Sequence, residues 1–151
     1  MTRREVREVA FMMLFQLEFR QDVSIDDTLL QYYTMDADSS DDEEEIPEVK
    51  LSQKDREYID AVIKGVGEKK SELDSVITEY AKGWSLERII KVDLSVLRYC
   101  IYEMKYMADR TPLAVSINEA VEISKKYGTE KSKSFVNGVL SSFYKALTGE
   151  K

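Results

Sequence analysis

The sequence predicts an all-α protein built as a compact bundle of six or seven helices. Apolar residues recur at the i, i+3, i+4, i+7 spacing of amphipathic helices along most of the 151 residues. No segment alternates between apolar and polar residues as a strand would, and only Pro47 and Pro112 interrupt the helical pattern. A chain of this length suits one hydrophobic core, so a single domain over residues 1–151 is expected.

The first predicted helix covers residues 3–20, and a weaker one covers residues 25–35. The apolar face of the first helix consists of Val6, Val9, Ala10, Met13, Leu14 and Leu17. Residues 36–50 are predicted to form an acidic, flexible loop, since they offer too little apolar surface to offset the entropy of ordering. The net negative charge comes entirely from this loop: without the eight acids of residues 36–48, the net charge of −7 would become +1.

The rest of the chain continues the helical periodicity. Helices or helical turns are predicted over residues 52–66, 71–81, 85–89, 93–107, 116–127 and 131–147. Ser52 and Asp55 form a capping signal, Asp93 is expected to cap its helix, and Ser116 with Glu119 reads as a capping box. Gly83 is expected to stop the preceding helix, and Trp84 is expected to cover the core.

The composition argues against catalysis. Histidine, the commonest general base, is absent, and no Gly-rich phosphate loop or metal-ligand spacing occurs, so no catalytic residue, metal or cofactor is expected. The one cysteine, Cys100, lies on an apolar helical face and suggests an inert thiol in a reducing, cytoplasmic setting. Glu103 falls off that face and is expected to be exposed. No run approaches the roughly 20 apolar residues of a membrane span.

One stripe of the first helix combines guanidinium groups with aromatic rings. On a helical wheel this stripe, beside the apolar face, consists of Arg3, Arg4, Arg7, Phe11 and Phe15. Arginines that pair with phosphates and rings that stack on unpaired bases are typical of single-stranded RNA binding. The alternative is that the phenylalanines pack against a neighbouring helix and the arginines are merely solvated.

A second basic and aromatic region, KKYGTEKSKSF, spans residues 125–135 at a predicted junction between helices. Backbone N–H groups at such a junction can also meet phosphate. The alternative is a lysine-rich solvated turn in which Tyr127 and Phe135 serve the core.

Four sequence blocks together resemble the NusB family of transcription antitermination factors. They are RREVREVAFMMLFQLEF at 3–19, WSLERIIKVDLSVLRYCIYEM at 84–104, VSINEAVEISKKYGTEKS at 115–132 and FVNGVL at 135–140. The similarity covers nearly the whole chain, and residues 20–50 contribute least.

The resemblance implies two packed helical subdomains and a non-catalytic role in the bacterial cytoplasm. The implied ligands are a boxA-type single-stranded RNA and the ribosomal protein NusE, within an RNA polymerase antitermination complex on ribosomal RNA operons. The positions that match family RNA contacts are Arg3, Arg4, Arg7, Phe15, Lys131 and Phe135. The positions assigned to partner binding are Tyr102, Glu103 and Tyr106. Phe15 stands where relatives often have tyrosine, and Glu5 interrupts an arginine run that many relatives keep, so affinity and salt dependence are open.

Two other functions are compatible with the sequence. One is a protein-interaction module that does not bind RNA on its own, for example a homodimer that hides its arginine stripe. An RNA binder should lose affinity with rising salt and with loss of Arg4 or Arg7, whereas the interaction module should not respond to RNA. The other is an RNA-modifying enzyme, because NusB-like domains also occur fused to RNA methyltransferases. We expect no such cofactor domain, since no residues follow Lys151.

Overall fold

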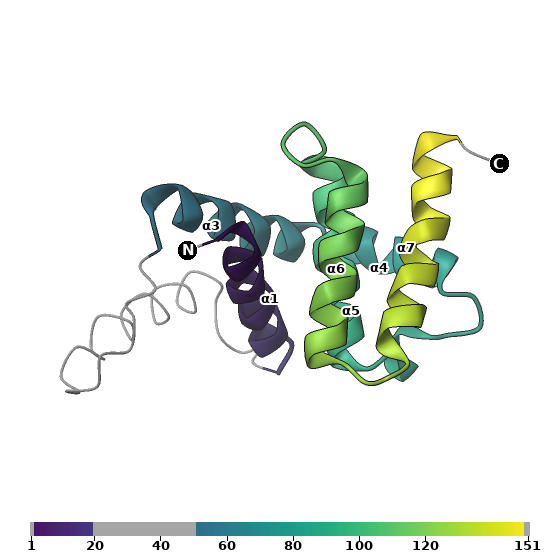
Figure 1. Cartoon of the computed structure of the whole chain (residues 1–151). Helices are drawn as coiled ribbons and strands as arrows, with labels where there is room; N and C mark the ends of the chain where they lie inside the picture. Colours follow the sequence, from purple (N-terminus) through teal and green to yellow (C-terminus); the bar gives the residue numbers. More distant parts are fainter. Residues whose placement is uncertain (1, 20–50, 150–151) are drawn as a thin grey trace. The chain divides into compact units, whose positions relative to one another are not determined.

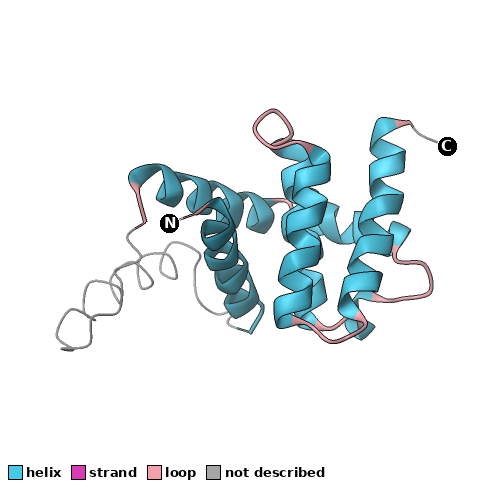
Figure 2. Ribbon diagram, viewed as in Figure 1, coloured by secondary structure: helices cyan, strands magenta, loops and turns pink. Residues whose placement is uncertain are grey.

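The computed structural model describes residues 2–19 and 51–149, and within them every regular element is helical (Figure 2). The elements are α1 (Arg3–Phe19), α3 (Gln53–Glu68), α4 (Lys70–Tyr80), the short 3-10 helix η2 (Leu86–Arg88), α5 (Lys91–Tyr106), α6 (Leu113–Tyr127) and α7 (Ser132–Thr148). The predicted all-α class is confirmed. The predicted helix at 25–35 and the acidic loop at 36–50 lie outside the described residues.

The chain forms two compact units, Met1–Lys64 and Gly65–Lys151. The expectation of one domain over the whole chain stays a prediction. In the first unit, α3 starts at the capping signal that the sequence contains: the Asp55 N–H donates to Ser52 Oγ at 3.1 Å, and the Ser52 N–H donates to Asp55 Oδ2 at 3.2 Å. These reciprocal bonds satisfy N–H groups that a helix start leaves without partners, so this predicted start is confirmed.

The second unit is a bundle of α4, α5, α6 and α7. Helix α6 contacts α5 and α7, and α4 also contacts both of them. Figure 1 shows α6 (green) and α7 (yellow) side by side, joined by a turn at one end of the bundle. Helix α5 is buried on almost every side from Asp93 to Ile101 because its neighbours surround it. The apolar core between these helices includes Leu73, Ile77, Leu94, Leu97, Ile101, Val136 and Leu140.

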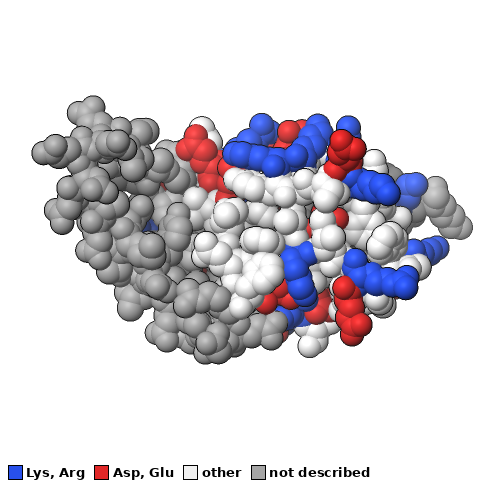
Figure 3. All heavy atoms as spheres, turned by 90° about the horizontal axis from the view of Figure 1, so that it is seen from below, with Lys and Arg blue, Asp and Glu red and all other residues white. Residues whose placement is uncertain are grey.

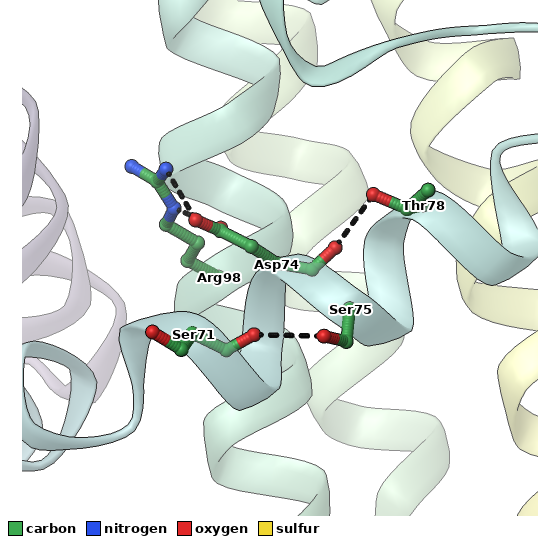
Figure 4. A network of polar contacts seen from close by, with 5 residues as sticks. All are labelled: Ser71, Asp74, Ser75, Thr78 and Arg98. Carbon is green, nitrogen blue, oxygen red and sulfur yellow. Dashed lines mark hydrogen bonds and ion pairs between the residues drawn. The ribbon is translucent and has the colours of Figure 1, made fainter.

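An ion pair fastens α4 to α5 (Figure 4). Arg98 Nε lies 2.7 Å from Asp74 Oδ1, and Arg98 Nη2 lies 3.1 Å from Asp74 Oδ2, so the guanidinium grips both carboxylate oxygens. Within α4, the Ser75 and Thr78 hydroxyls donate to the carbonyls of Ser71 and Asp74, one turn back, at 3.0 and 2.9 Å. A bidentate, nearly buried pair of this kind fixes the relative rotation of the two helices.

Two predicted caps are wrong. Helix α5 begins before Asp93, which lies buried in the first turn, and Ile90 occupies the N-cap position. Helix α6 begins directly after Pro112, whose φ of −56° already suits a helix start, so Ser116 lies inside the helix and does not open a capping box with Glu119. The Ser116 hydroxyl is instead used in a contact between helices, described below.

Candidate RNA-binding and partner-binding surfaces

The buried face of α1 is wider than the sequence pattern indicates. Arg7 and Phe11 are only 3% and 1% exposed, so the expectation that they lie on an open stripe beside the core is wrong. The buried residues are Val6, Arg7, Ala10, Phe11, Met13 and Leu14. Five of them fill two adjacent rows at four-residue spacing, Met13 lies beside these rows, and all six span an arc of roughly 160° at about 100° per residue. Arg3 and Arg4, in contrast, are exposed at the start of the helix.

Three phenylalanines follow one another along α1 at four-residue spacing. The rings of Phe11 and Phe15 stack with centroids 6.0 Å apart, and those of Phe15 and Phe19 meet edge to face at 5.0 Å. The row passes from buried Phe11 through half-buried Phe15 to Phe19, which is 62% exposed. Sequence reasoning missed Phe19, although its four-residue spacing from Phe15 was the signal that could have found it.

The turn between α6 and α7 carries the second predicted cluster. Lys131 is exposed at the N-cap of α7, and the N–H of half-buried Phe135, one turn later, donates to the Lys131 carbonyl at 3.1 Å. The Thr129 N–H donates to Ser132 Oγ at 2.9 Å, which holds the turn in shape. A Cβ at Gly128 would overlap the Ser132 side chain and a backbone carbonyl of α6, so glycine is required for this close approach.

Trp84 extends this cluster. Its ring centroid lies 5.6 Å from that of Phe135, with the planes inclined by 62°, and the side chain is 49% exposed. The expectation that Trp84 covers the core is therefore wrong. Helix α4 ends at Tyr80 with Ala81 at its C-cap, so the helix stops before Gly83, the residue expected to stop it. Gly83, with φ at +85°, lies in the turn that follows, directly before the exposed indole.

A buried carboxyl lies beneath the start of α7. Asp93 is 6% exposed, and burial raises its pKa, while a hydrogen bond from Ser132 opposes that rise. Its Oδ1 has no hydrogen-bond partner among the residues the structure describes. Since Ser132 is the first residue of α7, the contact ties the first turn of α5 to the segment that carries Lys131 and Phe135.

Glu103, a predicted partner contact, is 1% exposed. Its Oε1 accepts a hydrogen bond of 2.6 Å from the hydroxyl of Ser116 on α6, which is also buried. The expectation that Glu103 is exposed is wrong because α5 is covered on several sides, so a residue off the main apolar stripe still faces a neighbouring helix. Glu103 joins α5 to α6 and cannot meet a partner directly without a rearrangement.

The two tyrosines beside Glu103 form a partly exposed cluster with charged residues. The rings of Tyr102 and Tyr106 lie 5.2 Å apart, and the Tyr106 side chain is 42% exposed. Lys105 and the Tyr106 hydroxyl both donate to the Glu72 carboxylate, and these two hydrogen bonds lower the pKa of Glu72. The Lys69 Nζ lies 5.5 Å from the centre of the Tyr106 ring. We call these five residues the Tyr106 cluster; Lys69 and Glu72 were missed because they lie far from the tyrosines in sequence.

Charges on the surface are mixed. Figure 3 views the end of the bundle at which α6 joins α7, and lysine and arginine side chains lie there in separate groups with acidic residues between them. Among the described residues, no three His, Cys, Asp or Glu side chains are grouped to hold a metal ion. None of the described helices is long and apolar enough to cross a membrane.

Comparison with known proteins decides the family. The sequence model of the NusB family matches residues 4–145. The chain belongs to the NusB family. Among curated relatives, the transcription antitermination protein NusB of Acetivibrio thermocellus is 43% identical, over 96% of this chain and 90% of the relative. The NusB of Enterococcus faecalis is 40% identical, over 99% of this chain and 94% of the relative.

Solved NusB-like structures share the fold. NusB from T. maritima superposes with a TM-score of 0.79 at 35% identity, covering 96% of this chain and 92% of the other. A structure of antitermination factors NusB and NusE in complex with dsRNA matches with a TM-score of 0.75 over 97% and 99% of the two chains. Its identity is 24%, so this second likeness concerns the fold alone.

Proposed function

We propose that this member of the NusB family is a non-catalytic transcription antitermination factor of the bacterial cytoplasm. It binds a boxA-type single-stranded RNA together with the ribosomal protein NusE, and acts with RNA polymerase during transcription of ribosomal RNA operons. The observation that carries the proposal is that exposed Lys131 and half-buried Phe135 lie one helical turn apart at the α6–α7 turn. A lysine and an aromatic ring this close together in the chain suit a phosphate next to an unpaired base.

The RNA-binding residues have different roles in this proposal. Arg3 and Arg4 are exposed and contact phosphates, while the partly exposed ring of Phe15 stacks on a base. Arg7 and Phe11 are buried, so they support the helix that presents the other residues and do not touch RNA themselves.

The Tyr106 cluster is the proposed contact for NusE. It offers an exposed tyrosine ring, and tyrosine is enriched at protein interfaces. Glu103 does not contact the partner itself. Its hydrogen bond with Ser116 holds α5 against α6 and so fixes the position of the neighbouring tyrosines.

The test is binding of a labelled boxA-like RNA with and without NusE, for the full chain and three variants. Lys131→Ala removes a proposed phosphate contact, and Tyr106→Ala removes a proposed partner contact. Lys145→Ala is the control, because it removes another exposed lysine from the far end of α7. We expect Lys131→Ala to weaken RNA binding and Tyr106→Ala to weaken only the enhancement by NusE, with Lys145→Ala unchanged.

Two outcomes would overturn the proposal. If the full chain binds no RNA with or without NusE, and its mass increases with concentration, the homodimeric interaction module becomes the better function. If Lys145→Ala weakens binding as much as Lys131→Ala, attraction to RNA is diffuse and the α6–α7 turn is not the site.

A further inference from the structure

We propose that Trp84 is a second base-stacking residue, which with Phe135 forms a two-ring platform for unpaired bases of the bound RNA. The inference rests on the proposed RNA binding at the α6–α7 turn and adds a residue to it. The two rings come from distant parts of the chain and meet with centroids 5.6 Å apart. We call this pair the Trp84 platform.

The exposure of Trp84 requires an explanation. Indole is among the largest apolar side chains, and burying it would remove much surface from water, yet half of it remains exposed. The planes of the two rings are inclined by 62°, so neither ring covers the other face to face. Trp84 therefore keeps open aromatic surface of the kind on which a base stacks.

The position of the indole is fixed by its backbone. The Trp84 N–H donates to the Ala81 carbonyl at 3.0 Å, and η2 begins two residues later. Gly83 adopts the left-handed conformation at φ +85°, although a Cβ there would meet nothing within 4 Å. Glycine is thus needed for its left-handed backbone conformation and not because a side chain would clash. This conformation sets the direction in which the chain continues to Trp84.

Exposed lysines lie close in sequence to both rings of the platform, which favours RNA over an apolar partner. Lys82 lies two residues before Trp84, Lys131 is the N-cap of α7, and Lys133 lies in its first turn; all three are exposed. Lysines that meet phosphates beside rings that meet bases are the combination found at single-stranded nucleic acid sites. In a duplex the base faces are stacked on one another and out of reach, so the ligand is an unpaired segment.

The chain itself supplies the probe, because Trp84 is its one tryptophan. Stacking of a base on indole quenches its fluorescence, so a titration with boxA-like single-stranded RNA reports on this residue alone. We expect quenching that saturates together with binding, and none with the same RNA annealed to its complement. Trp84→Ala should weaken binding about 5- to 150-fold, the range for losing one stacked base.

Two further variants complete the experiment. Trp84→Phe keeps a ring and should retain most of the affinity, which separates stacking from a folding defect in Trp84→Ala. Leu147→Ala is the control, since it removes an exposed apolar side chain from the far end of α7 and should leave binding unchanged.

The outcomes distinguish this inference from the proposed function. RNA binding that depends on Lys131 but leaves the Trp84 fluorescence and the Trp84→Ala affinity unchanged overturns the platform alone. Absence of RNA binding in the full chain, with or without NusE, overturns both.

Discussion

Replacing Ser116 by alanine tests the assignment of Glu103 as a buried structural residue. The hydroxyl of Ser116 donates to Glu103 Oε1 at 2.6 Å, a length typical of a bond to a carboxylate, and both side chains are at most 2% exposed. Water therefore cannot replace the lost donor. A hydrogen bond to a charged group contributes about 1.5–3 kcal/mol, and alanine returns roughly 0.5 kcal/mol of helix propensity. We expect a net loss of about 1–2.5 kcal/mol in the free energy of unfolding.

The assay is urea unfolding followed by circular dichroism, with a thermal melt as a second measure. For a chain of this size the loss corresponds to roughly 2–10 °C in Tm. Ser142→Ala is the matched control, because it makes the same change on an exposed face of α7 and should cost nothing. If Ser116→Ala is as stable as Ser142→Ala, the buried bond is wrong and Glu103 returns as a candidate partner contact.

Three other predictions concern the second unit. Arg98→Met breaks the bidentate pair to α4 and leaves the Asp74 carboxylate, which has little exposure, without the guanidinium. Urea unfolding should then show a loss of about 2–4 kcal/mol in the free energy of unfolding, and a loss below about 0.5 kcal/mol would contradict this. Burial raises the pKa of Asp93 above its ordinary value of 3.8, so the folded protein holds that proton more tightly than the unfolded chain and loses stability as pH rises through the raised pKa. The stability of Asp93→Asn should therefore increase relative to the wild type as the pH rises above about 4, whereas a difference that stays constant with pH would refute the assignment. Gly65→Ala should lose stability in the same assay because a Cβ would overlap the Tyr102 ring. Gly138→Ala has open space around it and should gain about 0.5–1 kcal/mol in the free energy of unfolding. Equal gains for the two variants would rule out the overlap.

Local signals in the sequence predicted the helices well. The first helix, expected over residues 3–20, is observed as Arg3–Phe19, and the one expected over residues 131–147 is observed as Ser132–Thr148. The capping signal at Ser52 also held, because its partners lie within one turn of chain. Periodicity and capping depend on residues close together in the sequence, so a single sequence is enough to predict them.

The errors concern contacts between distant segments. A helical wheel shows which face of α1 is most apolar but not how much of the helix other residues cover. Arg7 and Phe11 were therefore predicted to lie on an exposed stripe, although both are buried. Glu103 was expected at the surface because its own helix suggests it, whereas the covering residue, Ser116, lies on another helix. The contact of Trp84 with Phe135 likewise appears only once α7 packs beside the turn after α4.

The salt dependence of RNA affinity tests the central claim most directly. The full chain with NusE would be titrated with boxA-like RNA over a series of salt concentrations, beside a variant carrying both Arg4→Ala and Lys131→Ala. Each phosphate contact to single-stranded RNA contributes about 0.7 to the slope of log K against log salt, so the slope of the double variant should be shallower by roughly 1.4. Equal slopes for the two proteins would contradict phosphate binding by these residues.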